Sequence, residues 1–206
     1  QALFRSGPGG EITVQRRAIA AAPRPPVPIA LRLEDEEFAP GTLWTSRLGM
    51  ILNQPGWTAT QVAEWLRTWQ EALLAIPDSA DPSGAISGRY FDALPFNLIV
   101  APDGSSRFID LEWEHEGSLP LAYLAYRGLV GSLWRVSSCE APRERRHRSM
   151  ATLVREVLAL VGHQASARDL VRWRQQDLVL RQAIRFGQCD ATPSGAAKLL
   201  ALRMPV

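Results

Sequence analysis

The chain has 206 residues, of which 46% are hydrophobic and 21% are charged, so it can form one sizeable core and is not expected to be disordered. Its formal net charge is only +2, and no apolar run approaches the roughly 20 residues of a membrane span, so no span is expected. Two cysteines, Cys139 and Cys189, are too few for a disulfide framework and fit a reducing, cytoplasmic compartment.

Lysine is almost absent from the chain, because Lys198 is the only one and all other basic residues are arginines. An arginine-rich run at 143–148 could contact phosphate or nucleic acid. A solvated loop or helix start explains that run better, so nucleic-acid binding is not expected.

The N-terminal residues predict a β-hairpin. Residues 2–5 and 11–19 read as strands, joined by a glycine-rich turn at 6–10. Such a turn can also cradle phosphate through backbone amides, but the lysine and hydroxyl of a P-loop are missing. Residues 20–28 are rich in alanine and proline and predict a connector.

The next segment is extended and then turns into a helix. Residues 29–33 alternate as a strand, an acidic run follows at 34–37, and Pro40 and Gly41 form a turn before a helix at 43–52. This pattern fits a hinge between two lobes and fits an ordinary strand-turn-helix equally well.

An amphipathic helix follows, with Thr58 or Thr60 as its N-cap and an end near Ala75. Its apolar residues recur at steps of three and four, which places them on one buried face. These residues are Val62, Trp65, Leu66, Trp69 and Leu73.

Three short extended runs come next, at 86–91, 98–101 and 107–113, and the Pro-Asp-Gly-Ser turn at 102–105 joins the last two into a hairpin. Beyond residue 118 the spacing of apolar residues predicts mainly helix. The predicted helices cover about 119–136, 144–161 and 167–186, before a tail of small residues at 193–206 with one further helical turn.

Three polar residues in this β region have a spacing that carries chemistry. Asn97 follows Asp92 by five positions, and Asp110 follows Asn97 by 13. With Asp92 at a strand end, its carboxylate can orient an acceptor hydroxyl and take its proton. The loop and hairpin then bring the Asn97 amide oxygen and the Asp110 carboxylate to one Mg²⁺ ion.

A purely structural interpretation stays open. Asp92 could cap a turn that Asn97 closes, while Asp110 pairs with an arginine such as Arg107 or Arg127. Glu112 lies two residues after Asp110, on the same side of a strand, so it could join the metal ligands or pair with an arginine and order the following loop.

The runs Tyr90–Asn97, Phe108–Trp113 and Pro120–Leu129 resemble the kinase-like C-terminal region of some bacterial SAM-dependent methyltransferase and polysaccharide-modifying proteins, a region that is itself similar to aminoglycoside phosphotransferases. The similarity covers roughly residues 12–134. The resemblance implies that Asp92 is the catalytic aspartate, that Asn97 and Asp110 are metal ligands, and that Mg²⁺ and ATP are cofactors.

The chain also departs from the pattern of active kinases. Arg16 stands where the resemblance implies the phosphate-binding lysine, and its planar fork does not replace a compact ammonium in a tight site. Tyr90 replaces the histidine before the catalytic aspartate, and Glu112 replaces the glycine after the metal aspartate. The segment before the hinge is too short and proline-rich for a glutamate-bearing helix.

The expected fold is therefore α+β and protein-kinase-like, with a reduced, extended N-terminal lobe and hinge at 1–42 and a mainly helical C-terminal lobe at 43–206. Because the chain begins with Gln1 in a strand-like segment, we expect it to be the C-terminal part of a longer polypeptide with an upstream enzyme domain.

Two functions follow from this interpretation. The first is phosphotransfer from a Mg-nucleotide to a hydroxyl of a sugar or glycan. The alternative is a catalytically degenerate kinase-like binding or scaffold module, attached to a SAM-dependent methyltransferase of surface-polysaccharide biosynthesis.

Overall fold

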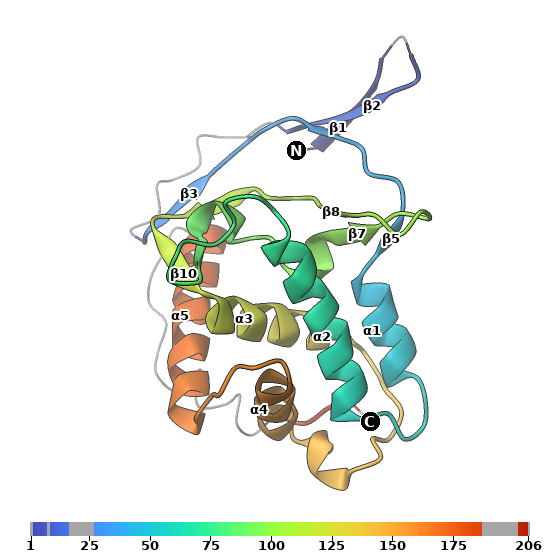
Figure 1. Ribbon diagram of the computed structural model, residues 1–206, viewed down its shortest axis with the longest axis vertical. Helices are drawn as coiled ribbons and strands as arrows, with labels where there is room; N and C mark the ends of the chain where they lie inside the picture. Colours follow the sequence, from blue (N-terminus) through green and yellow to red (C-terminus); the bar gives the residue numbers. More distant parts are fainter. Residues whose placement is uncertain (1, 8, 17–26, 187–201, 206) are drawn as a thin grey trace.

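The computed structural model describes residues 2–7, 9–16, 27–186 and 202–205. Within these ranges the chain has a mixed α+β architecture, with packed helices and several small antiparallel sheets (Figure 1). The helices are α1 (Thr45–Leu52), α2 (Ala59–Leu74), α3 (Leu121–Leu133), α4 (Met150–Leu160) and α5 (Ala167–Phe186). Among the described residues, no helix is both long enough and apolar enough to cross a membrane.

The strands are short, and several of them pair over long sequence distances. They are β1 (Ala2–Ser6), β2 (Ile12–Arg16), β3 (Ile29–Leu31), β4 (Glu36–Glu37), β5 (Thr42–Leu43), β6 (Ala85–Ser87), β7 (Leu98–Val100), β8 (Ser106–Phe108), β9 (Trp113–His115) and β10 (Ser118–Pro120). They form four sheets, in the orders β1-β2-β4, β3-β9, β5-β7-β8 and β10-β6.

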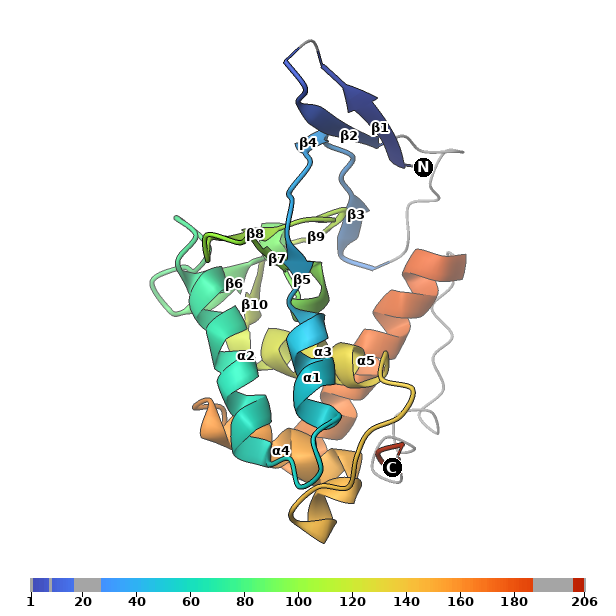
Figure 2. The ribbon, with the colours of Figure 1, turned by 90° about the vertical axis from the view of Figure 1, so that its right-hand side faces the viewer.

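The β1-β2-β4 sheet projects from the rest of the molecule in two perpendicular views (Figures 1 and 2). β1 and β2 form the predicted hairpin, in which Phe4 lies opposite Val14. β4 pairs with the other edge of β2. The predicted end of the second strand at residue 19 and most of the predicted connector lie outside the described residues.

Two pairings connect this N-terminal part to the helical body. β3 pairs with β9, so that Ile29 lies opposite His115, and β5 pairs with β7. The predicted hairpin after Asn97 is confirmed as β7 and β8, where the Gly104 amide donates to the Ala101 carbonyl across the turn.

The predicted amphipathic helix is confirmed as α2, and Thr58 is its N-cap. The Thr58 side chain accepts a hydrogen bond from the Gln61 amide, and the Gln61 side chain accepts one from the Thr58 amide, which satisfies two helix-start donors reciprocally. All the predicted apolar-face residues of this helix are buried.

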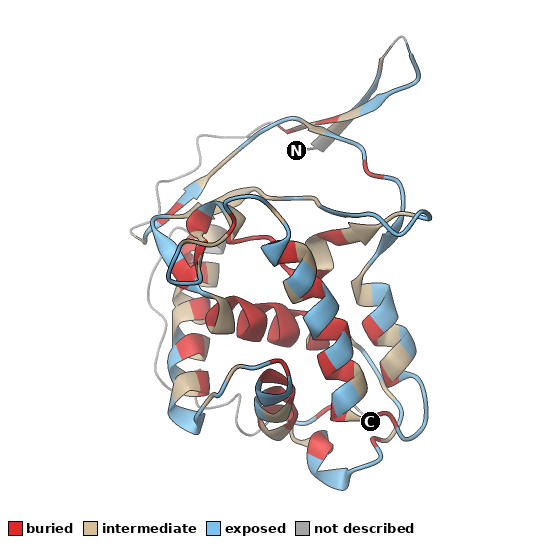
Figure 3. Ribbon diagram, viewed as in Figure 1, coloured by how far each residue is buried: buried red, intermediate tan, exposed pale blue. Residues whose placement is uncertain are grey.

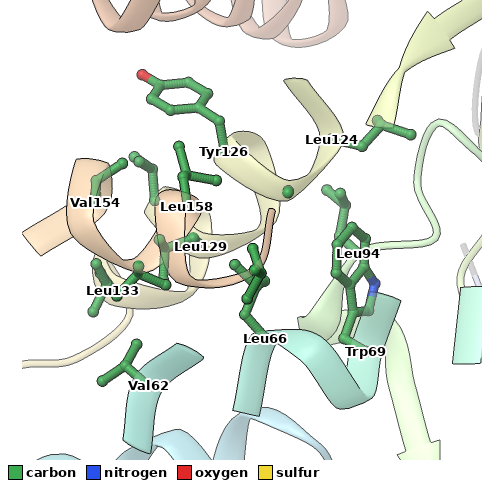
Figure 4. Close-up of a cluster of buried hydrophobic side chains, with 14 of the residues drawn as sticks. Val62, Leu66, Trp69, Leu94, Leu124, Tyr126, Leu129, Leu133, Val154 and Leu158 are labelled. Carbon is green, nitrogen blue, oxygen red and sulfur yellow. The ribbon is translucent and has the colours of Figure 1, made fainter. Parts of the chain in front are cut away.

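α3 lies at the centre of the core and is buried along nearly all of its length (Figure 3). Leucine and valine side chains of α2 and α4 pack against its Leu129 and Leu133 (Figure 4). The Tyr126 ring belongs to the same cluster, but its hydroxyl points away from it (Figure 4) and its ring contacts Trp173 of α5. The helix therefore joins the apolar core to α5.

Two predicted helices begin later than expected. The helix predicted from residue 119 starts at Leu121, because Ser118–Pro120 pair with β6 as β10. The helix predicted from residue 144 is split, with a 3₁₀ turn at Arg145–Arg148 before α4. Ser149 separates the two, since its hydroxyl accepts from the Thr152 amide and caps α4.

Candidate functional site

Asp92 lies in a tight turn and not at the end of a strand, which corrects the predicted strand at 86–91. Residues Gly88–Tyr90 form a 3₁₀ turn directly after β6. Gly88 is required there, because a Cβ atom would lie 1.8 Å from the His115 carbonyl oxygen. This close approach of two backbones bends the chain before Asp92.

Buried contacts hold the loop that follows Asp92. The indole of Trp69 in α2 donates to the Ala93 carbonyl at 2.8 Å. Pro95 packs so closely on α3 that a Cβ at Gly128 would lie 2.5 Å from its ring. The position of Asn97 is therefore set by both α2 and α3.

Both carboxylate oxygens of Asp92 have partners in the protein. One accepts from Arg127 of α3 at 3.3 Å, and the other accepts from the Trp113 amide at 3.1 Å. The residue is only 8% exposed. Burial raises the pKa of the Asp92 carboxyl above its ordinary value, and the nearby Arg127 charge opposes that shift.

Asn97 connects the backbones around the other two predicted residues. Its amide nitrogen donates to the Asp92 carbonyl at 2.9 Å and to the Asp110 carbonyl at 3.5 Å. The backbone carbonyl of Asn97 accepts a hydrogen bond from the backbone amide of Ile109 at 2.8 Å. The side chain therefore closes the loop, as in the structural alternative, and it also brings Asp92 and Asp110 near one another.

Asp110 lies just beyond β8, which ends at Phe108, and not within the predicted strand at 107–113. Its φ of 57° is in the left-handed region, which aspartate tolerates better than most residues. Asp110 thus lies between β8, which pairs with β7, and β9, which pairs with β3. In this conformation the Asp110 carboxylate contacts Arg16.

Arg16 binds three carboxylates from two segments of the chain, β4 and the link between β8 and β9. It contacts Asp110 at 2.5 Å, Glu112 at 2.9 Å, and Glu36 of β4. The arginine side chain is only 5% exposed, whereas those of Asp110 and Glu112 are 58% and 40% exposed. Burial lowers the pKa of Arg16, but the charges of Asp110 and Glu36 outweigh this effect, so its pKa lies above the ordinary value.

The charged residues at and around the predicted site thus form two ion-paired groups. The first, which we call the Arg16 cluster, contains Arg16, Glu36, Asp110 and Glu112. The second is a buried chain in which Arg127 lies between Asp92 and Asp177 of α5. The carboxylates of Asp92 and Asp110 therefore face different arginines.

A cavity beside the Arg16 cluster is small. Its volume is about 150 Å³, and it is lined by Arg16, Arg32, Glu34, Asp35, Glu36 and Leu111. Pockets that hold drug-sized ligands or cofactors usually enclose about 300–1,000 Å³. In this conformation the cavity accommodates less than a nucleotide.

The donor set at the cluster nevertheless suits a hard cation. The carboxylates of Asp110, Glu112 and Glu36 offer only oxygen ligands, and Mg²⁺ needs only one or two protein carboxylates. The Arg16 guanidinium supplies a positive charge among these carboxylates.

A second group with metal-ligand atoms lies near the start of α4. Glu144, His147 and Glu156 place their ligand atoms within 4.8 Å of one another. Arg146 already contacts both carboxylates, at 2.8 and 3.0 Å, and His147 binds Glu156 at 3.0 Å. Each of these three residues therefore already has a charged or hydrogen-bonding partner in the protein.

Sequence reasoning missed Glu36, the pairing of Arg127 with Asp92, and Asp177. Glu36 was part of an acidic run in which no member stood out. Asp177 carried a weak signal, since it is the only acidic residue in the second half of a helix that has arginines at positions 174 and 181.

Comparisons with protein-family models, curated proteins and solved structures gave no match to this chain.

Proposed function

We propose that the chain is a kinase-like module that no longer transfers phosphate and serves as a binding or scaffold unit for an attached enzyme, a SAM-dependent methyltransferase of surface-polysaccharide biosynthesis. The observation that carries this proposal is the Arg16 cluster. A guanidinium is held among the carboxylates that would otherwise bind the metal of a nucleotide.

The order of elements supports the kinase-like part of the proposal. An extended N-terminal part precedes two helices, the Asp92 loop, a hairpin and a further set of helices. This order fits a reduced, extended N-terminal lobe followed by a mainly helical C-terminal lobe.

The contacts of Asp92 support the loss of phosphate transfer. A catalytic base needs a carboxylate oxygen within hydrogen-bond reach of the acceptor hydroxyl. Both Asp92 oxygens are already bound, to Arg127 and to the Trp113 amide, in a site that is nearly closed to solvent. Freeing one of them would expose part of a buried ion pair.

Phosphotransfer to a sugar or glycan hydroxyl is the second candidate. It is favoured by the hydrogen bonds of Asn97 to the backbones of both Asp92 and Asp110, which hold the three predicted residues around one loop. In this candidate Arg16 would contact nucleotide phosphate after leaving its carboxylates.

An assay with γ-labelled ATP, Mg²⁺ and sugar or glycan acceptors separates the two candidates. We expect no label in the acceptor and no rise in melting temperature with about 5 mM Mg-ATP, because a ligand that does not bind the native state does not stabilise it. Label transfer that disappears in Asp92→Asn would establish the second candidate and overturn the first.

Replacing Arg16 by glutamine should create a divalent-cation site. Without the guanidinium, three carboxylates would face one another unpaired, and a cation would relieve that repulsion. We expect at least about tenfold tighter Mn²⁺ binding than in the wild type by isothermal titration, which corresponds to about 1.4 kcal/mol.

Arg5→Gln is the matched control for this variant, since Arg5 lies on the same hairpin but is exposed. It should leave Mn²⁺ binding unchanged. Unaltered or weaker Mn²⁺ binding in Arg16→Gln would show that Arg16 does not occupy the place of a cation.

A further inference from the structure

A second arginine-rich region lies between α3 and α5, apart from the Arg16 cluster. Asp177 of α5 is 2% exposed and contacts three arginines, namely Arg127 at 3.2 Å, Arg181 at 2.7 Å and Arg174 at 3.6 Å. Arg135 follows the end of α3 and donates to the Gly131 carbonyl at 2.7 Å.

Positive charge exceeds negative charge in this region. Its four guanidinium groups belong to Arg127, Arg135, Arg174 and Arg181, and the described residues within ion-pair distance of them contribute only two carboxylates, Asp92 and Asp177. The formal surplus is two positive charges. Excess charge of one sign in a partly buried site is costly unless an opposite charge is nearby.

Aromatic rings hold the outer guanidinium groups in place. Arg135 lies 3.7 Å over the Phe96 ring, and Arg174 and Arg181 lie 3.9 and 5.2 Å from the Trp134 ring. Such stacking orients a guanidinium and leaves its N–H groups free to donate at the edge. The donors are therefore already oriented before any ligand binds.

Two of these guanidinium groups lie near one another beside Gly131. Arg135 Nη1, which donates to the Gly131 carbonyl, and Arg181 Nη2 each lie 3.7 Å from the point where a Cβ atom of Gly131 would be, a point that lies 2.9 Å from the Phe96 ring. The Arg181 side chain is 39% exposed, so its guanidinium can also reach a ligand from solvent. A single oxyanion can contact two nitrogens arranged in this way.

Buried polar groups near the arginines also have no hydrogen-bond partner among the described residues. They are the hydroxyls of Tyr123, Tyr126 and Ser132, Gln182 Oε1, Arg174 Nε, and Arg174 Nη1, whose only charged contact is Asp177 at 3.6 Å. Tyr126 is fully buried, and its hydroxyl points away from the apolar cluster in Figure 4. Buried donors without acceptors are rare in native proteins and call for a ligand or ordered water.

The electrostatic surroundings of Arg135 and Arg174 favour the binding of an anion. Burial is the main cause that lowers the pKa of Arg135 and of Arg174, and the charge of Arg181 acts in the same direction. A bound anion would reverse part of both shifts.

We propose that the arginine cluster between α3 and α5, with Arg135 and Arg181 at its open edge, binds a phosphate group, either free or carried by a small ester. Arg135 and Arg181 donate to its oxygens, and their stacking on Phe96 and Trp134 fixes the geometry. The proposal is independent of the function assigned to the Arg16 cluster.

Isothermal titration with inorganic phosphate, at an ionic strength held constant with chloride, tests this site in the full chain. We expect saturable binding to one site, weakened at least about tenfold in Arg181→Gln and in Arg135→Gln. Arg172→Gln is the matched control, because Arg172 lies on α5 but is 70% exposed and pairs with Asp169. Circular dichroism establishes that each variant is folded.

The proposal would be overturned if phosphate showed no saturable binding up to about 50 mM. It would also be overturned if the wild type, Arg181→Gln and Arg135→Gln bound phosphate equally well. Glycerol phosphate as a second titrant distinguishes the source of the group. Equal affinity for both titrants indicates recognition of phosphate alone, and tighter binding of the ester indicates a carried phosphate. Arg16→Gln should leave both affinities unchanged.

Discussion

Replacing Asp177 by alanine should lower the free energy of unfolding by about 3–5 kcal/mol, because the change removes one member of a buried ion-paired network and leaves the other charges without compensation. Asp177 is 2% exposed and is the shared partner of arginines 127, 174 and 181. Equilibrium unfolding in urea, followed by circular dichroism, measures the loss.

Asp169→Ala is the matched control for this experiment. Asp169 also lies on α5 and pairs with Arg172, but the Arg172 side chain is 70% exposed and that of Asp169 is 32% exposed, against 2% for Asp177. An exposed pair of this kind contributes at most about 1 kcal/mol. Similar losses in Asp177→Ala and Asp169→Ala would mean that the buried network contributes no more than a surface pair.

Replacing Trp69 by alanine should have a comparable effect, with a loss of about 3–5 kcal/mol in the free energy of unfolding. Trp69 is fully buried between α2 and the Asp92 loop, and its indole nitrogen donates to the Ala93 carbonyl at 2.8 Å. The substitution therefore removes a large apolar side chain and a hydrogen bond that holds the loop.

Trp69→Phe separates these two contributions. It keeps most of the ring but leaves the buried Ala93 carbonyl without its donor, for which we expect a loss of about 1–3 kcal/mol. Leu74→Ala, at an exposed position of the same helix, should change stability by less than about 1 kcal/mol. A larger loss in Trp69→Phe than in Trp69→Ala would contradict this account.

Local sequence signals predicted the elements whose stability is decided locally. α2 was predicted because its apolar period and its Thr58 cap agree. The β7–β8 hairpin was predicted because Pro102 and Gly104 favour a tight turn. The boundary of α4 was missed because the arginines before Ser149 have good helix propensity, and the capping serine decided the start.

The spacing of Asp92, Asn97 and Asp110 predicts that they lie near one another, but it does not predict their charged partners. Asn97 donates to the backbones of both Asp92 and Asp110. Which charge each carboxylate meets depends on residues far along the chain, since Arg127 and Arg16 come from a core helix and from the N-terminal hairpin. A pattern of local spacing contains no information about such partners.

The left-handed conformation of Asp110 could not be foreseen either. The run from Arg107 to Trp113 has strand-like composition. In the structure the strand is interrupted at Asp110, and the chain then continues into β9, which pairs with β3. Tertiary pairing thus overrode local propensity, as it often does in short strands.

The pairing of β3 with β9 also determines an order of assembly. Ile29 is synthesised before its partner His115, and helices α1 and α2 lie between them in the chain. Closing so long a loop costs chain entropy before any hydrogen bond is gained. β3 therefore leaves the ribosome well before β9, and the part of the chain between them must already be built when the two strands pair.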